Sequence, residues 1–259
     1  MSNKNTYSRK DIIQAYAVKD NLFPAEATIL HLLQDDLSEM KMLDIGVGGG
    51  RTTVHFAGLV KEYVGVDYSE EMITACRERF SDDHGNMSFE VCDARDMGIF
   101  QDDSFDFILF SYNSIDYISH ADRLKALQEI RRVGKTGGYF LFSTHNINCI
   151  PMIFGLSNQI HSPARKILKN TAKWFLLNFV FNKPNAIKAM KNAPYAIFND
   201  GAFRFGVQTY YIRPDEQIKQ LTDGFKDVRV YLGSGREIES DVRLNSINDP
   251  WLHYLSVIK

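Results

Sequence analysis

The sequence predicts an α/β fold, in which a doubly wound, mostly parallel sheet carries an inserted helical cap. Short and almost wholly apolar runs alternate with segments of helical spacing, a pattern typical of parallel strands covered on both faces. A glycine-rich turn follows the first apolar run, where open α/β sheets bind their ligands. The alternation breaks after Asn146 and resumes near residue 209, which indicates one large insertion.

The first forty residues are expected to be helical. Residues 11–16 show a mixed helical face. Residues 25–37 carry Ile and Leu side chains at helical spacing, directly after Pro24, and proline is favoured in the first turn of a helix. We therefore expect a helix that begins at Pro24.

Strands and helices are then expected to alternate along the chain. Apolar runs predict strands at residues 40–45, 63–68, 87–93, 105–111 and 139–144. Helices are expected at residues 51–59, 69–80 and 121–133, with Ser69 as an N-cap before two acidic residues. Beyond the insertion, a helix from residue 214 that stops at Gly224 precedes strands at 227–232 and 251–259.

The composition excludes several classes of protein. A hydrophobic content of 44% suits a large buried core, and a net charge of -2 argues against a general attraction to nucleic acid. The three cysteines have no paired spacing and there is no H-E-x-x-H motif, so no metal site is expected. The polar N-terminus lacks a signal peptide's apolar core, and no apolar run is long enough to span a membrane. We expect a cytoplasmic location.

The turn in MLDIGVGGGRT (residues 42–52) does not fit the common phosphate-binding loops. A Walker loop requires a lysine that is missing here. A dinucleotide fingerprint counted from Gly46 and Gly48 places Arg51 where a small residue should let the helix pack on the strand. The pattern D-x-G-x-G-x-G does fit, from Asp44 to Gly50.

Four motifs in order resemble those of class I S-adenosylmethionine (SAM)-dependent methyltransferases. They are LDIGVGGG, VGVDYS, VCDARDM and FDFILFSYNSIDYI, and EIRRVGKTGGYFLFSTHN follows them. The resemblance covers roughly residues 40–146 and returns at 209–259. It implies a seven-stranded sheet with an antiparallel last strand. It also implies an N-terminal helical lid (1–38) with Tyr7 and Tyr16, a SAM-binding core (39–146 and 209–259) and an inserted substrate cap (147–208).

The resemblance implies a set of residues that hold SAM and its product S-adenosylhomocysteine (SAH). They are Asp44, Gly46, Gly48, Gly50, Asp67, Tyr68, Asp93, Ala94 and Ser111. Asp67 would accept hydrogen bonds from both ribose hydroxyls, and Asp93 with the Ala94 backbone would hold the adenine. Each residue also has an alternative interpretation. The glycines could simply serve a tight turn, and Asp67 could be a solvated acid at the end of a strand. Asp93 could cap a turn, and Tyr68 could contribute only to packing.

The candidate catalytic residues follow strands four and five. His145 directly follows FLFST, and imidazole is a common general base at neutral pH. Asp116 stands where many relatives have histidine, which suggests a carboxylate that steadies a developing cation in amine methylation. Tyr112 is the third candidate. His145 could instead bond a neighbouring loop, and Asp116 could cap the following turn.

The insertion is strongly basic. Residues 147–199 contain seven lysine or arginine residues and no acidic residue, which leaves the rest of the chain with a charge of -9. A helical face runs from Ala164 to Phe179, with Lys166, Lys169 and Lys173 away from it. The favoured interpretation is a helix that docks this face on the domain and roofs the substrate pocket. A peripheral membrane contact through 164–191, or positive charge aimed at an anionic substrate, stays open.

The sequence therefore indicates a SAM-dependent methyltransferase that acts on nitrogen or oxygen of a small-molecule or lipid-like acceptor, without a nucleic-acid partner. An NAD(P)-dependent oxidoreductase shares the glycine loop and the acid after strand two, but Arg51 disfavours it. A non-catalytic SAM-binding protein is a further alternative. RNA methylation lacks a supporting motif.

Overall fold

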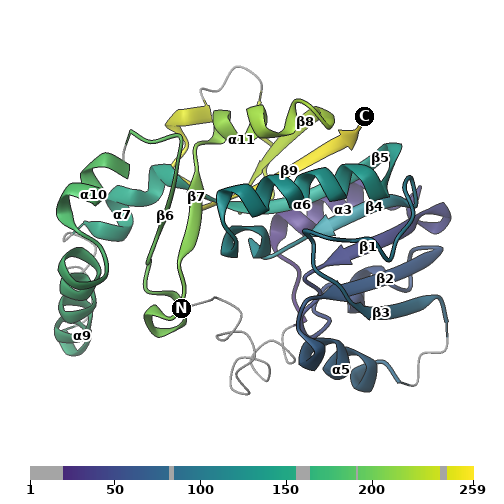
Figure 1. The fold of residues 1–259 in the computed structure, drawn as a ribbon, viewed down its shortest axis with the longest axis horizontal. Coiled ribbons are helices and arrows are strands. Elements are labelled where there is room, and N and C mark those ends of the chain that lie inside the picture. Colours follow the sequence, from purple (N-terminus) through teal and green to yellow (C-terminus); the bar gives the residue numbers. More distant parts are fainter. Residues whose placement is uncertain (1–19, 82–84, 156–163, 191, 240–243) are drawn as a thin grey trace.

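A sheet runs through the middle of the molecule and helices cover both of its faces (Figure 1). The computed structural model describes residues 20–81, 85–155, 164–190, 192–239 and 244–259. The strands described are β1 Lys41–Ile45, β2 Glu62–Asp67, β3 Met87–Val91, β4 Phe105–Phe110, β5 Gly134–Asn146, β6 Tyr195–Phe198, β7 Thr209–Ile212, β8 Phe225–Leu232 and β9 Trp251–Ile258. The α-helices described are α3 Pro24–Leu33, α4 Thr53–Phe56, α5 Glu70–Arg79, α6 His120–Val133, α7 Ile150–Phe154, α9 Ala164–Phe175, α10 Pro184–Met190 and α11 Pro214–Leu221.

The predicted seven-stranded sheet with an antiparallel last strand is confirmed. The strand order is β3-β2-β1-β4-β5, and all of these neighbours are parallel. Beyond β5 lies β9, which is antiparallel to both β5 and β8. The carboxyl ends of the parallel strands therefore meet at one edge of the sheet, where open α/β folds bind ligands.

A hairpin of β6 and β7 adds two strands that the sequence did not predict. β4 ends at Phe110, which pairs with Phe142 of β5. β5 continues, and its residue His145 pairs with Tyr211 of β7 on one side and with Trp251 of β9 on the other. Because β9 occupies the side of β5 opposite β4, β7 must lie beyond the carboxyl end of β4. The hairpin thus brings the end of the insertion and the residues that follow it to the ligand edge.

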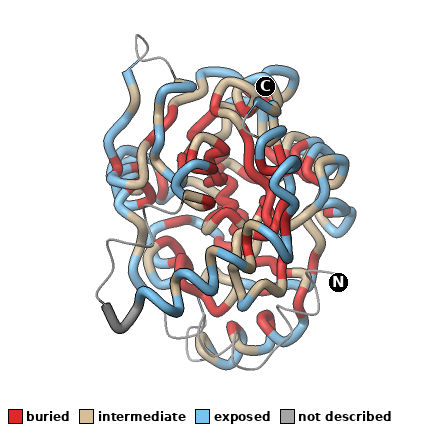
Figure 2. The backbone as a smooth tube through the Cα atoms, turned by 90° about the vertical axis from the view of Figure 1, so that its left-hand side faces the viewer, coloured by how far each residue is buried: buried red, intermediate tan, exposed pale blue. Residues whose placement is uncertain are grey.

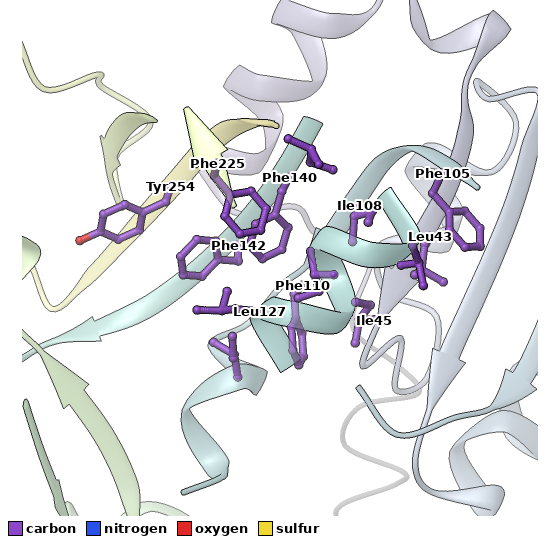
Figure 3. Close-up of a cluster of buried hydrophobic side chains, with 14 of the residues drawn as sticks. Leu43, Ile45, Phe105, Ile108, Phe110, Leu127, Phe140, Phe142, Phe225 and Tyr254 are labelled. Carbon is purple, nitrogen blue, oxygen red and sulfur yellow. The ribbon is translucent and has the colours of Figure 1, made fainter. Parts of the chain in front are cut away.

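The doubly wound arrangement is visible in the alternation along the central strands. Ile108 and Phe110 pack on one face with Leu127 of α6 (Figure 3). Phe107 and Leu109 pack on the other face. The second cluster contains Ile29 of α3, Phe56 of α4 and Ile73 of α5. Buried side chains on both faces explain why the strands read as continuous apolar runs.

Most expected elements have the predicted type, with different boundaries. Ser69 is confirmed as the N-cap of α5, because its Oγ accepts from the backbone N–H of Met72. The helix expected at residues 51–59 is only α4, Thr53–Phe56, and the chain turns at Gly58. Tyr7 and Tyr16 of the expected lid lie outside the described residues.

The insertion has a small apolar core of its own. Its buried members are Ile147, Ile150, Phe154, Leu177, Ile187, Ala196 and Phe198, together with Tyr211 of β7. Leu177 belongs to a π-helical segment, Leu176–Phe181, that continues α9. The expected docking of the α9 apolar face is wrong for its central residues, because Leu168 is 82% exposed and Phe175 is 54% exposed. Among the described residues, no helix has the length and apolar character needed to cross a membrane.

Candidate functional site

The glycine loop sits at the carboxyl end of β1 and is bent back onto β2. The backbone N–H groups of Gly46 and Val47 donate to the carbonyl of Val66, at 2.8 and 3.0 Å. Gly50 has a φ of +80°, and a Cβ added there would lie 2.5 Å from the ring of Phe80. Only glycine tolerates both the positive φ and the lack of space for a Cβ. Because glycine has no side chain, a ligand can approach the loop backbone closely.

Gly50→Ala is expected to lower the free energy of unfolding by about 2 kcal/mol or more, because alanine resists the positive φ and its methyl group clashes with Phe80. Urea unfolding measures the change. Gly58→Ala is the matched control, since a Cβ there meets no described atom within 4 Å, and we expect a change within about 0.5 kcal/mol. Equal effects at both positions would contradict the assigned strain.

Asp44 lies beneath the loop and is 1% exposed. Its Oδ2 accepts hydrogen bonds from the hydroxyls of Tyr63, at 2.6 Å, and Thr52. Burial raises the pKa of Asp44 to about 6, although both hydroxyls lower it. This geometry suits the expected role in orienting the loop. A direct contact with the amino acid end of SAM stays a prediction.

Asp67 ends β2 beside the loop. Its Oδ2 accepts from the backbone N–H of Gly48 at 3.1 Å, and its Oδ1 accepts from that of Ser69 at 2.9 Å. The backbone N–H of Tyr68 also donates to this carboxylate, which can still accept from a ligand hydroxyl because two carboxylate oxygens offer about four lone-pair sites. Burial raises the pKa of this carboxyl to about 6, against the lowering effect of the backbone N–H groups.

This pKa predicts a pH dependence of ligand binding. The carboxylate form of Asp67 accepts ribose hydroxyls, so affinity for SAH should fall as the pH drops through 6. We expect binding at pH 5 to be up to about tenfold weaker than at pH 8, measured by isothermal titration calorimetry. Asp67→Asn does not titrate, and its residual affinity should lose this dependence. A similar decline in the variant would assign the effect to another group, such as Asp44.

The adenine-side candidates lie together after β2 and β3. Burial, and then the negative charges of the nearby Asp67 and Asp93, raise the pKa of the Tyr68 hydroxyl. The carboxylate of Asp93 accepts two bonds from the Arg95 side chain, at 2.9 and 2.6 Å, and one from the Arg95 backbone at 3.0 Å. Asp93 therefore caps the turn, and Ala94 is half-buried within it. Contact with adenine stays a prediction.

Arg51, which does not fit a dinucleotide fingerprint, instead joins the loop to α3 and β4. Its guanidinium binds both carboxylate oxygens of Glu26, at 2.7 and 2.8 Å, and donates to the Ser111 hydroxyl at 2.6 Å. Ser111 in turn donates to Glu26. Burial alone would raise the pKa of Glu26, but Arg51 lowers it below its usual value. We did not predict Glu26 or Arg51 as parts of the site, because they are 25 residues apart.

His145 and Asp116 form a direct hydrogen-bonded pair. Asp116 Oδ2 lies 2.7 Å from His145 Nδ1 and 2.7 Å from its backbone nitrogen. A carboxylate only accepts, so this contact assigns the imidazole proton to Nδ1 and leaves the lone pair on Nε2. The sequence identified both residues, and the structure brings them together.

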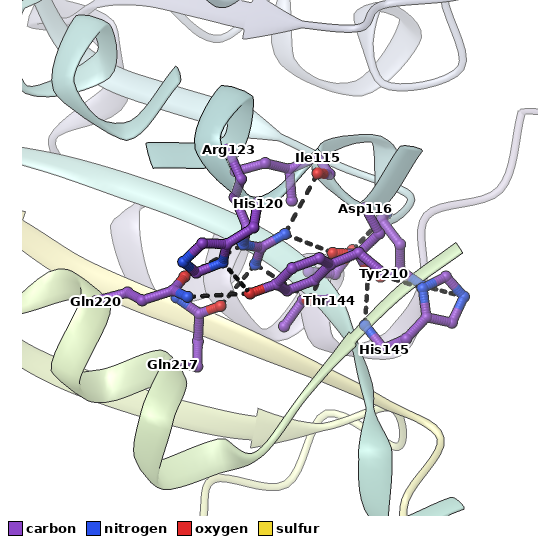
Figure 4. Close-up of polar contacts among 11 residues, drawn as sticks. Ile115, Asp116, His120, Arg123, Thr144, His145, Tyr210, Gln217 and Gln220 are labelled. Atoms are coloured by element: carbon purple, nitrogen blue, oxygen red, sulfur yellow. Dashed lines mark hydrogen bonds and ion pairs between the residues drawn. The ribbon is translucent and has the colours of Figure 1, made fainter. Parts of the chain in front are cut away.

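A buried arginine completes this pair (Figure 4). Arg123 Nη1 donates to Asp116 Oδ1 at 2.5 Å, and Arg123 Nη2 donates to Gln217 at 2.6 Å. The Asp116 oxygens thus accept from Arg123, His145 and Thr144, and the side chain is fully buried. Asp116 is therefore not available to steady a cation on an acceptor, which replaces the role suggested from the sequence.

Arg123 is not among the residues predicted from the sequence, although the sequence contains a signal for it. Arg123 shares one face of α6 with Ala126, Leu127 and Ile130, which are all buried. A charged residue within an apolar helical face must find a buried partner, because an unpaired charge there is too costly. This argument would have indicated a hidden carboxylate without identifying it as Asp116.

Aromatic rings surround the His145 imidazole. Tyr211, Trp251 and Tyr117 have ring centroids 4.8, 5.7 and 6.4 Å from it. Tyr112 is not one of these three rings. Its ring centroid lies 5.6 Å from that of Trp251 and 5.3 Å from that of Phe23. The rings form an aromatic wall around the imidazole, with Tyr211 tilted and Tyr117 and Trp251 edge-on to it.

The turn after β4 connects this wall to the glycine loop. Tyr112 and Asn113 have φ of 57° and 54°, a conformation that costs non-glycine residues energy and is common at functional sites. Asn113 Nδ2 lies 3.3 Å from His145 Nε2, and its buried Oδ1 has no hydrogen-bond partner among the described residues. A Cβ at Gly46 would lie 3.3 Å from Ser114, in the turn that carries Asp116. The loop and the pair thus share one edge.

Part of the chain is similar to known methyltransferases. Residues 42–138 match the family model described as a methyltransferase domain. The uncharacterized methyltransferase YcgJ of Bacillus subtilis (strain 168) is 33% identical over 166 residues, which cover 62% of each chain. The magnesium-protoporphyrin O-methyltransferase of Rhodobacter capsulatus is 31% identical over 44% of this chain and 49% of its own. The chain thus spans less than two thirds of the length of these relatives.

A solved structure extends the likeness in fold to the whole chain. The SAM-dependent methyltransferase of Clostridium acetobutylicum ATCC 824 superposes with a TM-score of 0.60 over 98% of both chains, at 17% identity. The matched family model and the two sequence relatives are described as methyltransferases, which counts against the oxidoreductase alternative. Among the described residues, no group of three or more histidine, cysteine or acidic side chains is arranged to hold a metal ion.

Proposed function

We propose, from the premise that this chain carries a class I SAM-dependent methyltransferase domain, that it moves the methyl group of SAM to a hydroxyl oxygen of a small-molecule or lipid-like acceptor. One observation carries the choice of oxygen over nitrogen. Asp116 holds the Nδ1 proton of His145, which leaves Nε2 as an acceptor, and Asn113 Nδ2, 3.3 Å from Nε2, would give way to the acceptor hydroxyl. A hydroxyl must lose its proton during methylation, whereas a neutral amine can attack without a base.

The residues of the loop edge fit SAM. The open backbone around Gly46, Gly48 and Gly50 suits the methionine part, with the backbone of Ser111 beside it. The Asp67 carboxylate suits the ribose hydroxyls, and the adenine would lie near Tyr68, Asp93 and Ala94. Bound SAM supplies a methyl group on a positively charged sulfur, so no phosphate-binding lysine is needed.

His145 is proposed as the general base. The acceptor oxygen bonds to the methyl carbon while the carbon–sulfur bond breaks and its electron pair stays on sulfur. The hydroxyl proton moves to His145 Nε2, and Asp116 stabilises the resulting imidazolium. Arg123 holds the Asp116 carboxylate in place. Tyr112 is proposed to line the acceptor side of the site instead of exchanging a proton.

The aromatic wall supports an acceptor with a flat, apolar body. Tyr117, Tyr211 and Trp251 offer ring faces and edges beside His145, and aromatic side chains bind such groups well. The name of the Rhodobacter capsulatus relative, an O-methyltransferase of magnesium-protoporphyrin, is in keeping with this choice. A peripheral membrane contact through residues 164–191 would bring a lipid-like acceptor to the same place.

We also propose the division of labour among the parts of the chain. Residues 39–146 and 209–259 form the SAM-binding core, and residues 147–208 the acceptor cap. Residues 1–38 act as a lid, in which Phe23 packs on Tyr112 and Trp251. Arg51 ties this segment to the glycine loop through Glu26.

Asp67→Ala is expected to weaken SAH binding by about 100-fold or more, since two hydrogen bonds to a charged acceptor are lost. Isothermal titration calorimetry on the purified protein measures it. NAD serves as the competing ligand, and we expect no binding of NAD. Exposed Asp35→Ala is the control, and should bind SAH as the native chain does. An unchanged affinity in Asp67→Ala would remove this residue from the cofactor site.

The acceptor class can be identified by incubating the protein with methyl-labelled SAM and a lysate of its own source, and then separating organic, small aqueous and macromolecular fractions. Label in the organic or the small aqueous fraction supports a lipid-like or a soluble small-molecule acceptor. Label in the macromolecular fraction alone would overturn the small-molecule proposal. SAH binding without transfer to any fraction would favour a non-catalytic SAM-binding protein.

A further inference from the structure

Helix α9 and the π-helical segment after it expose a row of large apolar side chains. We call this row the outer apolar face. Its members are Leu168, Phe175 and Phe179, with exposed fractions of 82, 54 and 51%. Figure 2, which views the molecule from the side on which α9 lies, shows this segment mostly in the exposed and intermediate colours. Contiguous apolar surface of this kind usually marks a site of association.

The outward direction of this face is fixed by contacts on the other side of the helix. The Trp174 indole N–H donates to the carbonyl of Phe154 at 2.9 Å. Leu177 is buried in the core of the insertion. The Lys173 side chain packs against Gly201. Residues 168, 172, 175 and 179 fall on the opposite side of the helix, so the strongest apolar stripe of the chain points away from the domain.

Positive charge accompanies this face. Lys169 of α9 has an exposed side chain, and the exposed Lys183 and Lys188 follow just before and within α10. Residues 147–199 contain no acidic residue, while the rest of the chain carries -9. A two-fold contact with a second copy would place two such basic segments against each other, and their repulsion disfavours it. Apolar side chains with flanking lysines instead match a surface that has an apolar interior and anionic groups above it.

We propose that the outer apolar face is a docking site for an anionic phospholipid bilayer, with α9 lying in the plane of the interface. Leu168, Phe175 and Phe179 enter the acyl boundary, and the lysines bind lipid phosphates. The negative remainder of the chain is repelled by the same surface, which orients the molecule with its cap toward the lipid.

The docking site is close to the methyl-transfer site. Leu177, on the inner side of the same segment, shares one apolar cluster with Tyr211. The Tyr211 ring lies 4.8 Å from that of His145. Docking through α9 therefore places the lipid on the outer side of the apolar cluster that contains Tyr211. This contact does not depend on whether methyl transfer occurs.

Vesicle co-sedimentation of the full chain without SAM tests the proposal. We expect binding to phosphatidylcholine vesicles that contain about 30% phosphatidylglycerol, and at least about tenfold weaker binding to pure phosphatidylcholine. Leu168→Ser combined with Phe175→Ser and Phe179→Ser should weaken binding to the anionic vesicles by about tenfold or more. The matched control replaces Leu32, Leu59 and Ile99 with serine, which are 46, 47 and 59% exposed elsewhere. It should bind as the native chain does.

Charge reversal separates the two parts of the surface. Lys169→Glu with Lys183→Glu should weaken binding to the anionic vesicles by about tenfold, whereas Lys61→Glu with Lys226→Glu, at the amino ends of β2 and β8, should not. SAH binding by each variant shows that the domain is intact and keeps this test independent of the proposed activity. Absence of vesicle binding, or equal loss in the control variants, would overturn the proposal. If the native chain self-associates without binding vesicles, and the serine variant does not self-associate, the face binds a second copy of the chain and the proposal is overturned.

Discussion

His145→Asn is expected to lower kcat for methyl transfer by about 100- to 10,000-fold, the usual contribution of a positioned general base. The asparagine amide can still donate to Asp116 in place of Nδ1, so the buried carboxylate keeps a partner. What the variant lacks is the lone pair of Nε2, which should receive the proton of the acceptor. Transfer of label from methyl-labelled SAM to the acceptor fraction measures the loss under single-turnover conditions.

Cofactor binding separates a chemical effect from a structural one. The SAH affinity of His145→Asn should stay within about threefold of the native value, because no proposed SAM contact involves this side chain. His31→Asn, on the exposed side of α3, is the matched control and should keep full activity. A fall in kcat of less than about threefold in His145→Asn would remove the imidazole from the proton transfer and leave positioning as the main source of catalysis.

The parts of the fold that the sequence predicts are those governed by local patterns. The central strands are buried on both faces, so Phe107, Ile108 and Leu109 form an unbroken apolar run that identifies a parallel strand. Ser69 caps its helix through a contact three residues away. The glycine loop is similarly local, because its positive φ angles need glycine regardless of the ligand.

The parts that could not be predicted depend on contacts between distant residues. Arg123 meets Asp116 only because a turn and a helix fold over each other, and it meets Gln217 across 94 positions. The β6–β7 hairpin is added where β4 stops, a position that no pattern within either strand specifies. The apolar stripe of α9 was visible, but periodicity defines a face without saying on which side of the helix the domain lies.

The interior of the site also changes how its residues are interpreted. Asp116 was chosen as a possible partner for a positive charge on the acceptor, and it does bind positive charge, but that charge belongs to Arg123 inside the protein. Arg51 counted against one class of loop, and its bidentate bond to Glu26 shows what the side chain does instead. In both cases the residue type correctly indicates a charged interaction, but the sequence does not identify the residue that takes part in it.

Arg123→Met is expected to lower the free energy of unfolding by about 3–5 kcal/mol, because the Asp116 carboxylate stays buried after losing its cationic partner. The methionine fills much of the same volume, so a cavity contributes little. Urea unfolding in the presence and absence of SAH measures the change. Arg131→Met, on a half-buried position of the same helix, should cost less than about 1 kcal/mol.

The double variant decides whether the pair or the packing is responsible. If the cost in Arg123→Met comes from the unpaired carboxylate, adding Asp116→Asn should restore part of the lost stability, with a coupling of about 1–3 kcal/mol. Full additivity would show that Arg123 acts mainly by packing against Tyr210, whose ring centre lies 4.7 Å from the guanidinium. Restored stability without restored methyl transfer is the expected combination, since an amide at position 116 stabilises the imidazolium of His145 less than a carboxylate does.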